Sequence, residues 1–150
     1  MTKRMLAALL ALVGLFVAIY LTLFKLGIIG QLVCAVGSCE TVQTSRWATF
    51  LGLPVAAWGV SYYVLVLAIA FAGTTERWED SPRIPLALVL LTAWGALFSL
   101  WLTWLELFVI HAICQWCVVS ALIAVALLAV AVLDWRESRA YEDAAPSVAG

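Results

Sequence analysis

Four cysteines in two closely spaced pairs are the residues of this 150-residue sequence best suited to chemistry. Cys34 and Cys39 have C-x4-C spacing, and Cys114 and Cys117 have C-x2-C spacing within the stretch HAICQWC. Four thiolates can hold a tetrahedral zinc ion, often from C-x2-C pairs. A disulfide between distant segments can act as a staple that stabilises by about 2–4 kcal/mol. Paired thiols can also pass electrons by thiol–disulfide exchange, and spacing alone does not choose among the three.

The position of Cys114 and Cys117 favours the redox interpretation. A helix that begins near Cys114 would place both sulfurs on one face, because residues three apart are neighbours with Cβ atoms about 5–6 Å apart. The free N–H groups and positive dipole end of a helix start stabilise a thiolate. C-x-x-C thiols in such settings have depressed pKa values and exchange readily. A second pair on a loop, such as Cys34 and Cys39, would complete a relay between a soluble partner and a lipid-dissolved molecule.

The elements that position these cysteines belong in a membrane, because the sequence is 66% hydrophobic and only 11% charged. Typical soluble domains are about 45–50% apolar and about 25% charged. Each of four apolar runs is long enough to cross about 30 Å of hydrocarbon as a helix: Met5–Phe24, Leu53–Gly73, Ile84–Leu105 and Leu107–Leu133. We predict an all-α integral membrane protein, a four-transmembrane-helix bundle with an extracytoplasmic loop that bears a cysteine pair.

The distribution of polar residues along the chain predicts one membrane domain followed by a polar tail. We expect the bundle to occupy residues 1–135 and a polar, disordered cytoplasmic tail to occupy residues 136–150. The first apolar run follows two basic residues, as in a signal peptide, but exceeds the roughly 7–15 residues of a signal core. We therefore expect it to be retained as a helix. A net charge of −1 and the lack of a basic patch argue against a nucleic-acid partner.

The basic residues predict the orientation of the bundle. With four crossings, both termini lie on one side. That side carries six of the eight basic residues, namely Lys3, Arg4, Arg77, Arg83, Arg136 and Arg139. The positive-inside rule makes this the cytoplasmic side of an inner or plasma membrane. Both cysteine pairs then face the extracytoplasmic side, where an oxidising compartment permits disulfides.

Two segments strongly resemble the bacterial homologues of vitamin K epoxide reductase: CAVGSCETVQTSRWATFLGLPVAAWG and LELFVIHAICQWC. The similarity includes the order of a loop cysteine pair, Ser-Arg-Trp, Gly-Leu-Pro at a helix start and C-x-x-C at the last helix. It covers about residues 6–133. The resemblance implies four helices around a quinone, either ubiquinone or menaquinone.

The resemblance also implies roles for individual residues. Cys114 and Cys117 correspond to the active-site pair, with Cys117 donating electrons to the quinone. Cys114 would exchange with Cys39, while Cys34 would meet a thioredoxin-fold partner, and Ser45 matches a serine near the active site of the family. Some members carry a fused thioredoxin-like domain. This chain is too short for one, so we expect a separate extracytoplasmic partner.

The sequence departs from the family at the quinone contacts. In the animal enzymes an asparagine on the second helix and a tyrosine on the fourth hydrogen-bond the quinone carbonyls, and Val55 and Ala121 align with these places. We expect the quinone to be held by apolar burial among Val55, Ala121, Ser45 and Cys117, with epoxide reduction disfavoured. Trp116 would add an aromatic plane beside the thiols or anchor the chain at the membrane interface.

Three further polar residues are candidates for moving protons or charge. Glu106 and His111 follow the third apolar run, where an ionisable side chain is a functional candidate. One possibility is that both side chains are only solvated at the membrane interface. The other is that they carry protons, because quinone reduction consumes two protons and histidine titrates near neutrality. Arg46 would steady a thiolate or bind a lipid phosphate.

Together these features predict a membrane thiol oxidoreductase. It would accept electrons from an extracytoplasmic thioredoxin-fold protein and reduce a membrane quinone, in support of disulfide bond formation. The alternative is a non-enzymatic membrane protein with structural disulfides or a four-cysteine zinc site.

Overall fold

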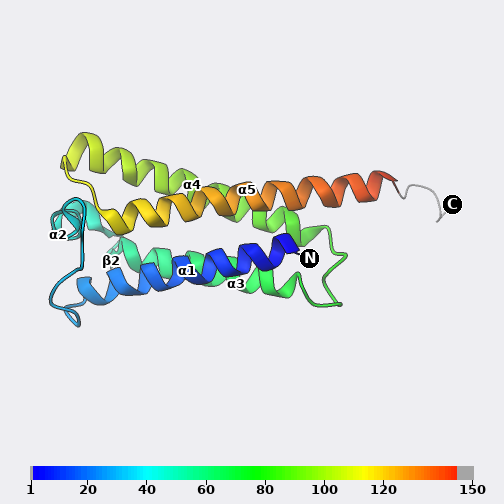
Figure 1. Ribbon diagram of the computed structural model, residues 1–150, viewed down its shortest axis with the longest axis horizontal. Coiled ribbons are helices and arrows are strands. Elements are labelled where there is room, and N and C mark those ends of the chain that lie inside the picture. Colours follow the sequence, from blue (N-terminus) through cyan, green and yellow to red (C-terminus); the bar gives the residue numbers. More distant parts are fainter. Residues whose placement is uncertain (1, 145–150) are drawn as a thin grey trace.

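Four long helices dominate the structure, a computed structural model that describes residues 2–144. They are α1 (Thr2–Lys25), α3 (Val55–Ala72), α4 (Arg83–Leu105) and α5 (Gln115–Ala144). Successive long helices run in opposite directions, so the first and last described residues lie at the same end of the bundle (Figure 1). Helix α1 packs against α3 and α5, and α4 packs against α5 and α3. The predicted four-helix bundle is therefore confirmed.

All four helices are long and apolar enough to span a membrane. Only 17–33% of the most apolar window of each helix is buried inside the protein, so most of its apolar surface points outward. An apolar exterior of this extent is stable in lipid, where helices satisfy their own backbone hydrogen bonds. The chain is thus a multi-pass membrane protein, and the ends of the helices lie within a few residues of the predicted runs, except in α5.

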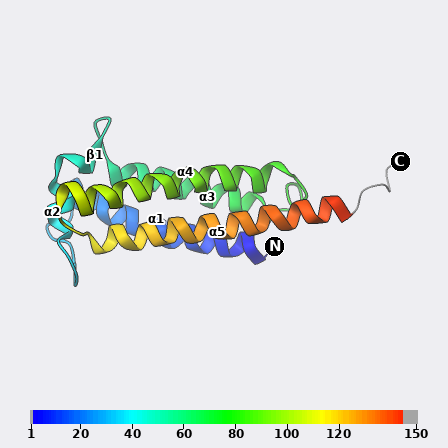
Figure 2. The ribbon, with the colours of Figure 1, turned by 90° about the horizontal axis from the view of Figure 1, so that it is seen from above.

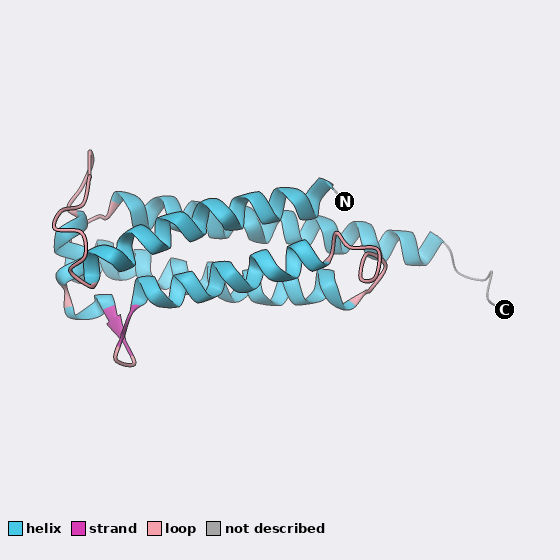
Figure 3. Ribbon diagram, turned by 90° about the horizontal axis from the view of Figure 1, so that it is seen from below, coloured by secondary structure: helices cyan, strands magenta, loops and turns pink. Residues whose placement is uncertain are grey.

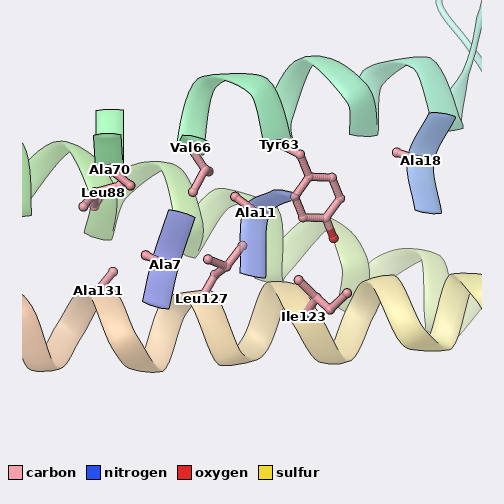
Figure 4. Packing of buried hydrophobic residues seen from close by; sticks show 10 residues of the cluster. All are labelled: Ala7, Ala11, Ala18, Tyr63, Val66, Ala70, Leu88, Ile123, Leu127 and Ala131. Atoms are coloured by element: carbon pink, nitrogen blue, oxygen red, sulfur yellow. The ribbon is translucent and has the colours of Figure 1, made fainter. Parts of the chain in front are cut away.

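The core of the bundle combines small side chains on α1 with larger ones on its neighbours. Figure 4 shows this cluster, whose buried members are Ala7, Ala11, Ala18, Tyr63, Val66, Ala70, Leu88, Ile123, Leu127 and Ala131. Alanines let helix backbones approach closely, which is how transmembrane helices associate without a hydrophobic driving force. The ring of Tyr63 occupies the space beside Gly14, where a Cβ atom would collide with it.

Ion pairs close the end of the bundle that carries the termini. The buried Arg4 donates from Nε to Asp134 Oδ2 at 3.1 Å and from Nη1 to the carbonyl oxygens of Gly73 and Glu79 at 2.7 and 2.9 Å. One guanidinium therefore joins α1, α5 and the loop between α3 and α4. Beside it, the exposed Lys3 pairs with Glu137.

Helix α5 continues to Ala144, well past the predicted boundary at residue 135, and projects beyond the other helices (Figure 2). The expected disorder from residue 136 is therefore not seen as far as Ala144, and residues 145–150 lie outside the described part of the chain. The helix persists because good helix formers follow Trp135, and because the Arg139 guanidinium stacks on the Trp135 ring one turn away, 5.1 Å from its centroid.

The short elements gather at the opposite end of the bundle. They are α2 (Cys39–Thr44), the 3₁₀-helix η1 (Arg46–Ala48), β1 (Thr49–Phe50), β2 (Leu53–Pro54) and the π-helix η2 (Glu106–Ile110). Figure 3 shows the two strands as a hairpin beside the loops at this end. These segments contain or flank all four cysteines, and we call this the cysteine end.

Candidate redox site at the cysteine end

The loop cysteines are joined by a disulfide. Cys34 and Cys39 are bonded with their Cα atoms 6.2 Å apart. Cys39 is the first residue of α2 and is buried, whereas Cys34 is half-buried on the loop before it. The more accessible sulfur is therefore that of Cys34.

The loop and the start of α5 lie side by side, although about 80 residues separate them in the sequence. Gly37 forms an antiparallel bridge with Cys114, and the Ser38 N–H donates to the Ile113 carbonyl oxygen at 2.7 Å. Gly37 has φ +86°, and a Cβ atom there would collide with the Ile113 carbonyl oxygen, so this approach requires glycine. Cys39 lies two residues beyond the bridge and shares a buried cluster with Cys114.

The two residues between the sulfurs of CQWC hold the loop in place. The Gln115 Oε1 atom accepts the N–H groups of Ala35 and Val36 at 2.9 and 3.0 Å. The Trp116 Nε1–H donates to the Val33 carbonyl oxygen at 2.6 Å, and its ring meets Tyr20 edge-on. The indole thus fixes the loop instead of lining the cavity described below, which departs from the expected quinone contact.

Cys114 and Cys117 are free thiols at the beginning of α5. Cys114 is fully buried, and its sulfur accepts the Cys117 backbone N–H at 3.4 Å. Hydrogen bonding from the Cys117 thiol and this N–H lowers the pKa of Cys114, although burial works in the opposite direction. The lowered pKa agrees with the expectation from the helix start and makes Cys114 the better attacking thiol.

Gln43 contacts both sulfurs from the loop side. Its Nε2 atom donates to Cys117 Sγ at 3.2 Å and lies 4.0 Å from Cys114 Sγ. Sequence reasoning missed this residue. The available signal was its place four residues after Cys39, which puts both on one face of a helix, but that signal exists only once α2 is known to be helical.

Glu106 lies directly against the thiol pair. The residue is only 4% exposed, Oε2 accepts the Cys114 N–H at 3.1 Å, and the carboxyl lies near the Cys117 thiol. The π-helical turn makes this possible, since Glu106 begins η2 and its carbonyl oxygen accepts the Ala112 N–H at 3.1 Å. A buried carboxyl beside a thiol can exchange a proton with it.

His111 and Arg46 lie away from the thiols. His111 is exposed and takes a left-handed conformation, with φ +57°, that ends η2. Arg46 is also exposed, and its guanidinium stacks on the Trp47 ring at 4.8 Å from the centroid. Of the three residues expected to carry protons or charge, the structure brings Glu106 alone to the sulfurs.

A cavity of about 320 Å³ adjoins Cys117 and extends between α3, α4 and α5. Its lining includes four residues expected at the quinone site, namely Ser45, Val55, Cys117 and Ala121, together with Gln43, Tyr62, Phe98, Glu106 and Ser120. Most of the lining surface is apolar. Trp94 lines the cavity and is 67% exposed on the outside of α4, so the cavity borders the lipid-facing surface.

The disulfide between Cys34 and Cys39 argues against a four-cysteine zinc site. The Cys34–Cys39 bond uses two of the four sulfurs that a four-thiolate site would need. Within residues 2–144, no cluster of three or more His, Cys, Asp or Glu side chains is arranged to hold a metal ion. The geometry instead sets one disulfide beside one thiol pair, which is an arrangement suited to thiol–disulfide exchange.

A comparison with protein family models gives one match. The model of the vitamin K epoxide reductase family matches residues 5–132, which is most of the chain and covers all of α3 and α4, most of α1, the first part of α5 and the four cysteines. Membership of this family makes the protein a membrane oxidoreductase. From its sequence, fold and paired cysteines, the chain belongs to the vitamin K epoxide reductase family.

Proposed function

We propose that the protein oxidises the thiols of a separate thioredoxin-fold protein and passes the two electrons to a membrane quinone, in support of disulfide bond formation. One observation carries the proposal: the Cys34–Cys39 disulfide lies against the Cys114–Cys117 thiol pair, and Cys117 lines an apolar cavity. One side of the cysteine set is thus accessible to a protein and the other to a lipid-soluble molecule.

The relay begins at the half-buried Cys34. A partner thiolate attacks Cys34 and releases Cys39, which then attacks Cys114 of an oxidised Cys114–Cys117 pair and releases Cys117. The second partner thiol frees Cys34, and Cys34 finally attacks Cys39 to release Cys114. The partner becomes a disulfide and the Cys114–Cys117 pair becomes a dithiol. The structure has a Cys34–Cys39 disulfide and free Cys114 and Cys117 thiols, which is the state expected at the end of these exchange steps.

The second half-reaction takes place at the cavity. The Cys114–Cys117 dithiol loses two electrons and two protons and becomes a disulfide, and the quinone takes up two electrons and two protons and becomes a quinol. The Gln43 amide stabilises negative charge on Cys117 by its hydrogen bond to the sulfur. The Glu106 carboxyl, which lies near the Cys117 thiol, accepts the proton released there. Ser45, Val55 and Ala121 line the space that the quinone ring would occupy.

The partner would bind at the exposed loop that carries Cys34. Val33 and Val36 flank this cysteine and are 74% and 71% exposed, so they offer apolar contacts to a protein that approaches the disulfide. In the proposed orientation the cysteine end is extracytoplasmic and both termini are cytoplasmic, as the distribution of basic residues indicates. The loop then faces the compartment in which disulfides form.

The function is tested with purified protein, a reduced thioredoxin-fold protein and a short-chain quinone, with quinone loss followed by absorbance. We expect turnover for the wild type. Cys39→Ser should abolish turnover with the protein partner, because the link to Cys114 is gone. It should retain turnover with dithiothreitol, which can reduce the Cys114–Cys117 pair directly.

Two outcomes would contradict the proposal. Equal turnover of Cys39→Ser and the wild type with the protein partner would exclude the relay. A set of reactive thiols whose number, counted by gel shift, does not change with quinone would show that the cysteines are structural staples. Metal analysis of the same preparation tests the zinc alternative independently.

A further inference from the structure

Two adjacent tyrosines on α3 have hydroxyl groups in opposite situations. The Tyr63 hydroxyl hydrogen-bonds with the carbonyl oxygen and the hydroxyl of Ser120 at 3.0 and 2.7 Å, and Figure 4 shows its ring pointing from α3 toward α5. The Tyr62 hydroxyl is also buried, but it has no hydrogen-bond partner among residues 2–144. Among residues 2–144, it is the single buried side-chain nitrogen or oxygen atom without a hydrogen-bond partner.

An unpaired buried hydroxyl is unfavourable, because it has lost its hydrogen bonds to water without replacement. The fold nevertheless makes room for this one. A Cβ atom at Gly95 on α4 would collide with the ring and hydroxyl of Tyr62, so glycine leaves the space that the side chain fills. The Tyr63 ring packs edge-on against the other side, with ring centroids 4.9 Å apart. The Tyr62 hydroxyl is therefore packed against Gly95 with its donor unused.

Tyr62 lines the same cavity as Cys117. It lies seven residues beyond the start of α3, which is about 10 Å along the helix from the cysteine end at about 1.5 Å per residue. Cys117 is the third residue of α5 and lies near that end. The hydroxyls of Ser45 and Ser120, which also line the cavity, are hydrogen-bonded to the Val42 carbonyl oxygen and to Tyr63. The cavity thus has the Cys117 sulfur near the cysteine end, and deeper in the bundle it is lined by Tyr62, whose O–H donor has no partner.

We propose that, when a quinone enters the cavity, the Tyr62 side chain shifts away from Gly95 and its hydroxyl donates a hydrogen bond to one carbonyl oxygen, which orients the quinone ring. The inference rests on the proposed function. A para-quinone carries an acceptor at each end of its ring, which suits a site with the sulfur of Cys117 at one end and a lone donor at the other. Val55 and Ala121, at the places where the animal enzymes carry polar contacts, offer no side-chain donor. Tyr62 supplies that contact from another position.

The test measures quinone binding as well as turnover. Menadione is titrated into detergent-solubilised wild type, Tyr62→Phe and Tyr63→Phe, with tryptophan quenching as the signal. We expect Tyr62→Phe to raise the dissociation constant about five- to tenfold, which corresponds to one hydrogen bond. Tyr63→Phe keeps the ring and should bind menadione like the wild type. The matched ligand 2-methylnaphthalene has the same rings without carbonyl oxygens and should bind all three proteins equally.

Thermal unfolding without quinone separates binding from structure. Tyr62→Phe should unfold at the same or a higher temperature than the wild type, because it removes an unpaired hydroxyl. Tyr63→Phe should unfold at a lower temperature, because it loses the bonds to Ser120. Equal menadione affinity for Tyr62→Phe and the wild type would overturn the inference but leave the proposed function intact. A wild type that binds no menadione would overturn both.

Discussion

At the scale of single residues, the two thiols of the C-x-x-C pair have different surroundings. Cys114 is fully buried against the loop disulfide, and its pKa is lowered mainly by hydrogen bonding from Cys117. Cys117 lines the cavity and contacts Gln43 and Glu106. These surroundings agree with the proposed roles, in which Cys114 exchanges with the loop and Cys117 transfers electrons to the quinone.

The lowered pKa of Cys114 leads to a prediction about its partner. Cys117→Ala removes the thiol that hydrogen-bonds to the Cys114 sulfur, so the thiolate loses stabilisation and the pKa of Cys114 should rise. Cys117→Ser keeps an O–H donor and should hold that pKa lower than the alanine variant does. The measurement is a pH titration of thiolate ultraviolet absorbance. Identical midpoints for the two variants would show that the hydrogen bond is not the cause.

The buried Glu106 carboxyl is expected to accept the proton from Cys117. Glu106→Gln keeps an oxygen that can accept the Cys114 N–H but cannot take up a proton. We expect the rate of quinone reduction to fall about 10²-fold, the lower end of general acid–base effects, in stopped-flow measurements with the pre-reduced protein. Exchange with the protein partner should continue.

Glu106→Gln should also change the pKa of Cys114. The charge of Glu106 raises the pKa of Cys114, so its neutralisation should lower that pKa and increase the thiolate fraction. A slower quinone step despite more Cys114 thiolate would identify proton transfer as the lost function. A quinone step as fast as that of the wild type would remove Glu106 from the mechanism.

At the scale of elements, the loop and α5 meet through a backbone contact at Gly37. Gly37→Ala should strain the left-handed backbone, at about 1–3 kcal/mol, and also push the loop away from Ile113. We expect slower turnover with the protein partner and unchanged turnover with dithiothreitol.

Gly52 provides the matched control for this change. It has a similar φ of +81°, but no atom lies within 4 Å of an added Cβ. Gly52→Ala therefore carries the backbone strain without the collision. If both variants slow the relay equally, strain in general and not the Gly37–Cys114 contact is responsible.

The elements also indicate what the sequence could and could not predict. Long apolar runs determine transmembrane helices, so the four helices and the end of the bundle that carries the cysteines were predictable. The π-helical turn at Glu106 was not, because it depends on how α4 meets the chain leading to Cys114. Gln43 and Tyr62 were missed for the same reason: each acquires its significance from a partner, or the lack of one, on another helix.

At the scale of the whole molecule, ion pairs between helices lie at one end of the bundle, and the four cysteines lie at the other end. Arg4 and Asp134 are buried together at the end that carries the termini, and Arg4 also holds two backbone carbonyl oxygens there. Arg4 thereby ties α1 to α5 and to the loop between α3 and α4 at this end. Stability and reactivity are thus located at opposite ends of the same helices.

Removal of the buried arginine should destabilise the whole bundle. Arg4→Leu leaves Asp134 as an uncompensated buried charge, and we expect a loss of about 3–5 kcal/mol. The thermal unfolding temperature in detergent reports the change. Lys3→Gln breaks the neighbouring exposed pair with Glu137, which solvent screens, and should lower that temperature much less. Equal shifts for the two variants would contradict the importance of the buried pair.

In the proposed function, the border between the cavity and the outside of α4, marked by Trp94, would determine how the quinone is supplied. A molecule that enters there arrives by lateral diffusion within a leaflet, so its aqueous solubility has little influence on the rate. The concentration that governs saturation is the mole fraction of quinone among the lipids. Dilution of the bilayer with extra phospholipid should then slow turnover, even when the amounts of protein and quinone per volume stay constant.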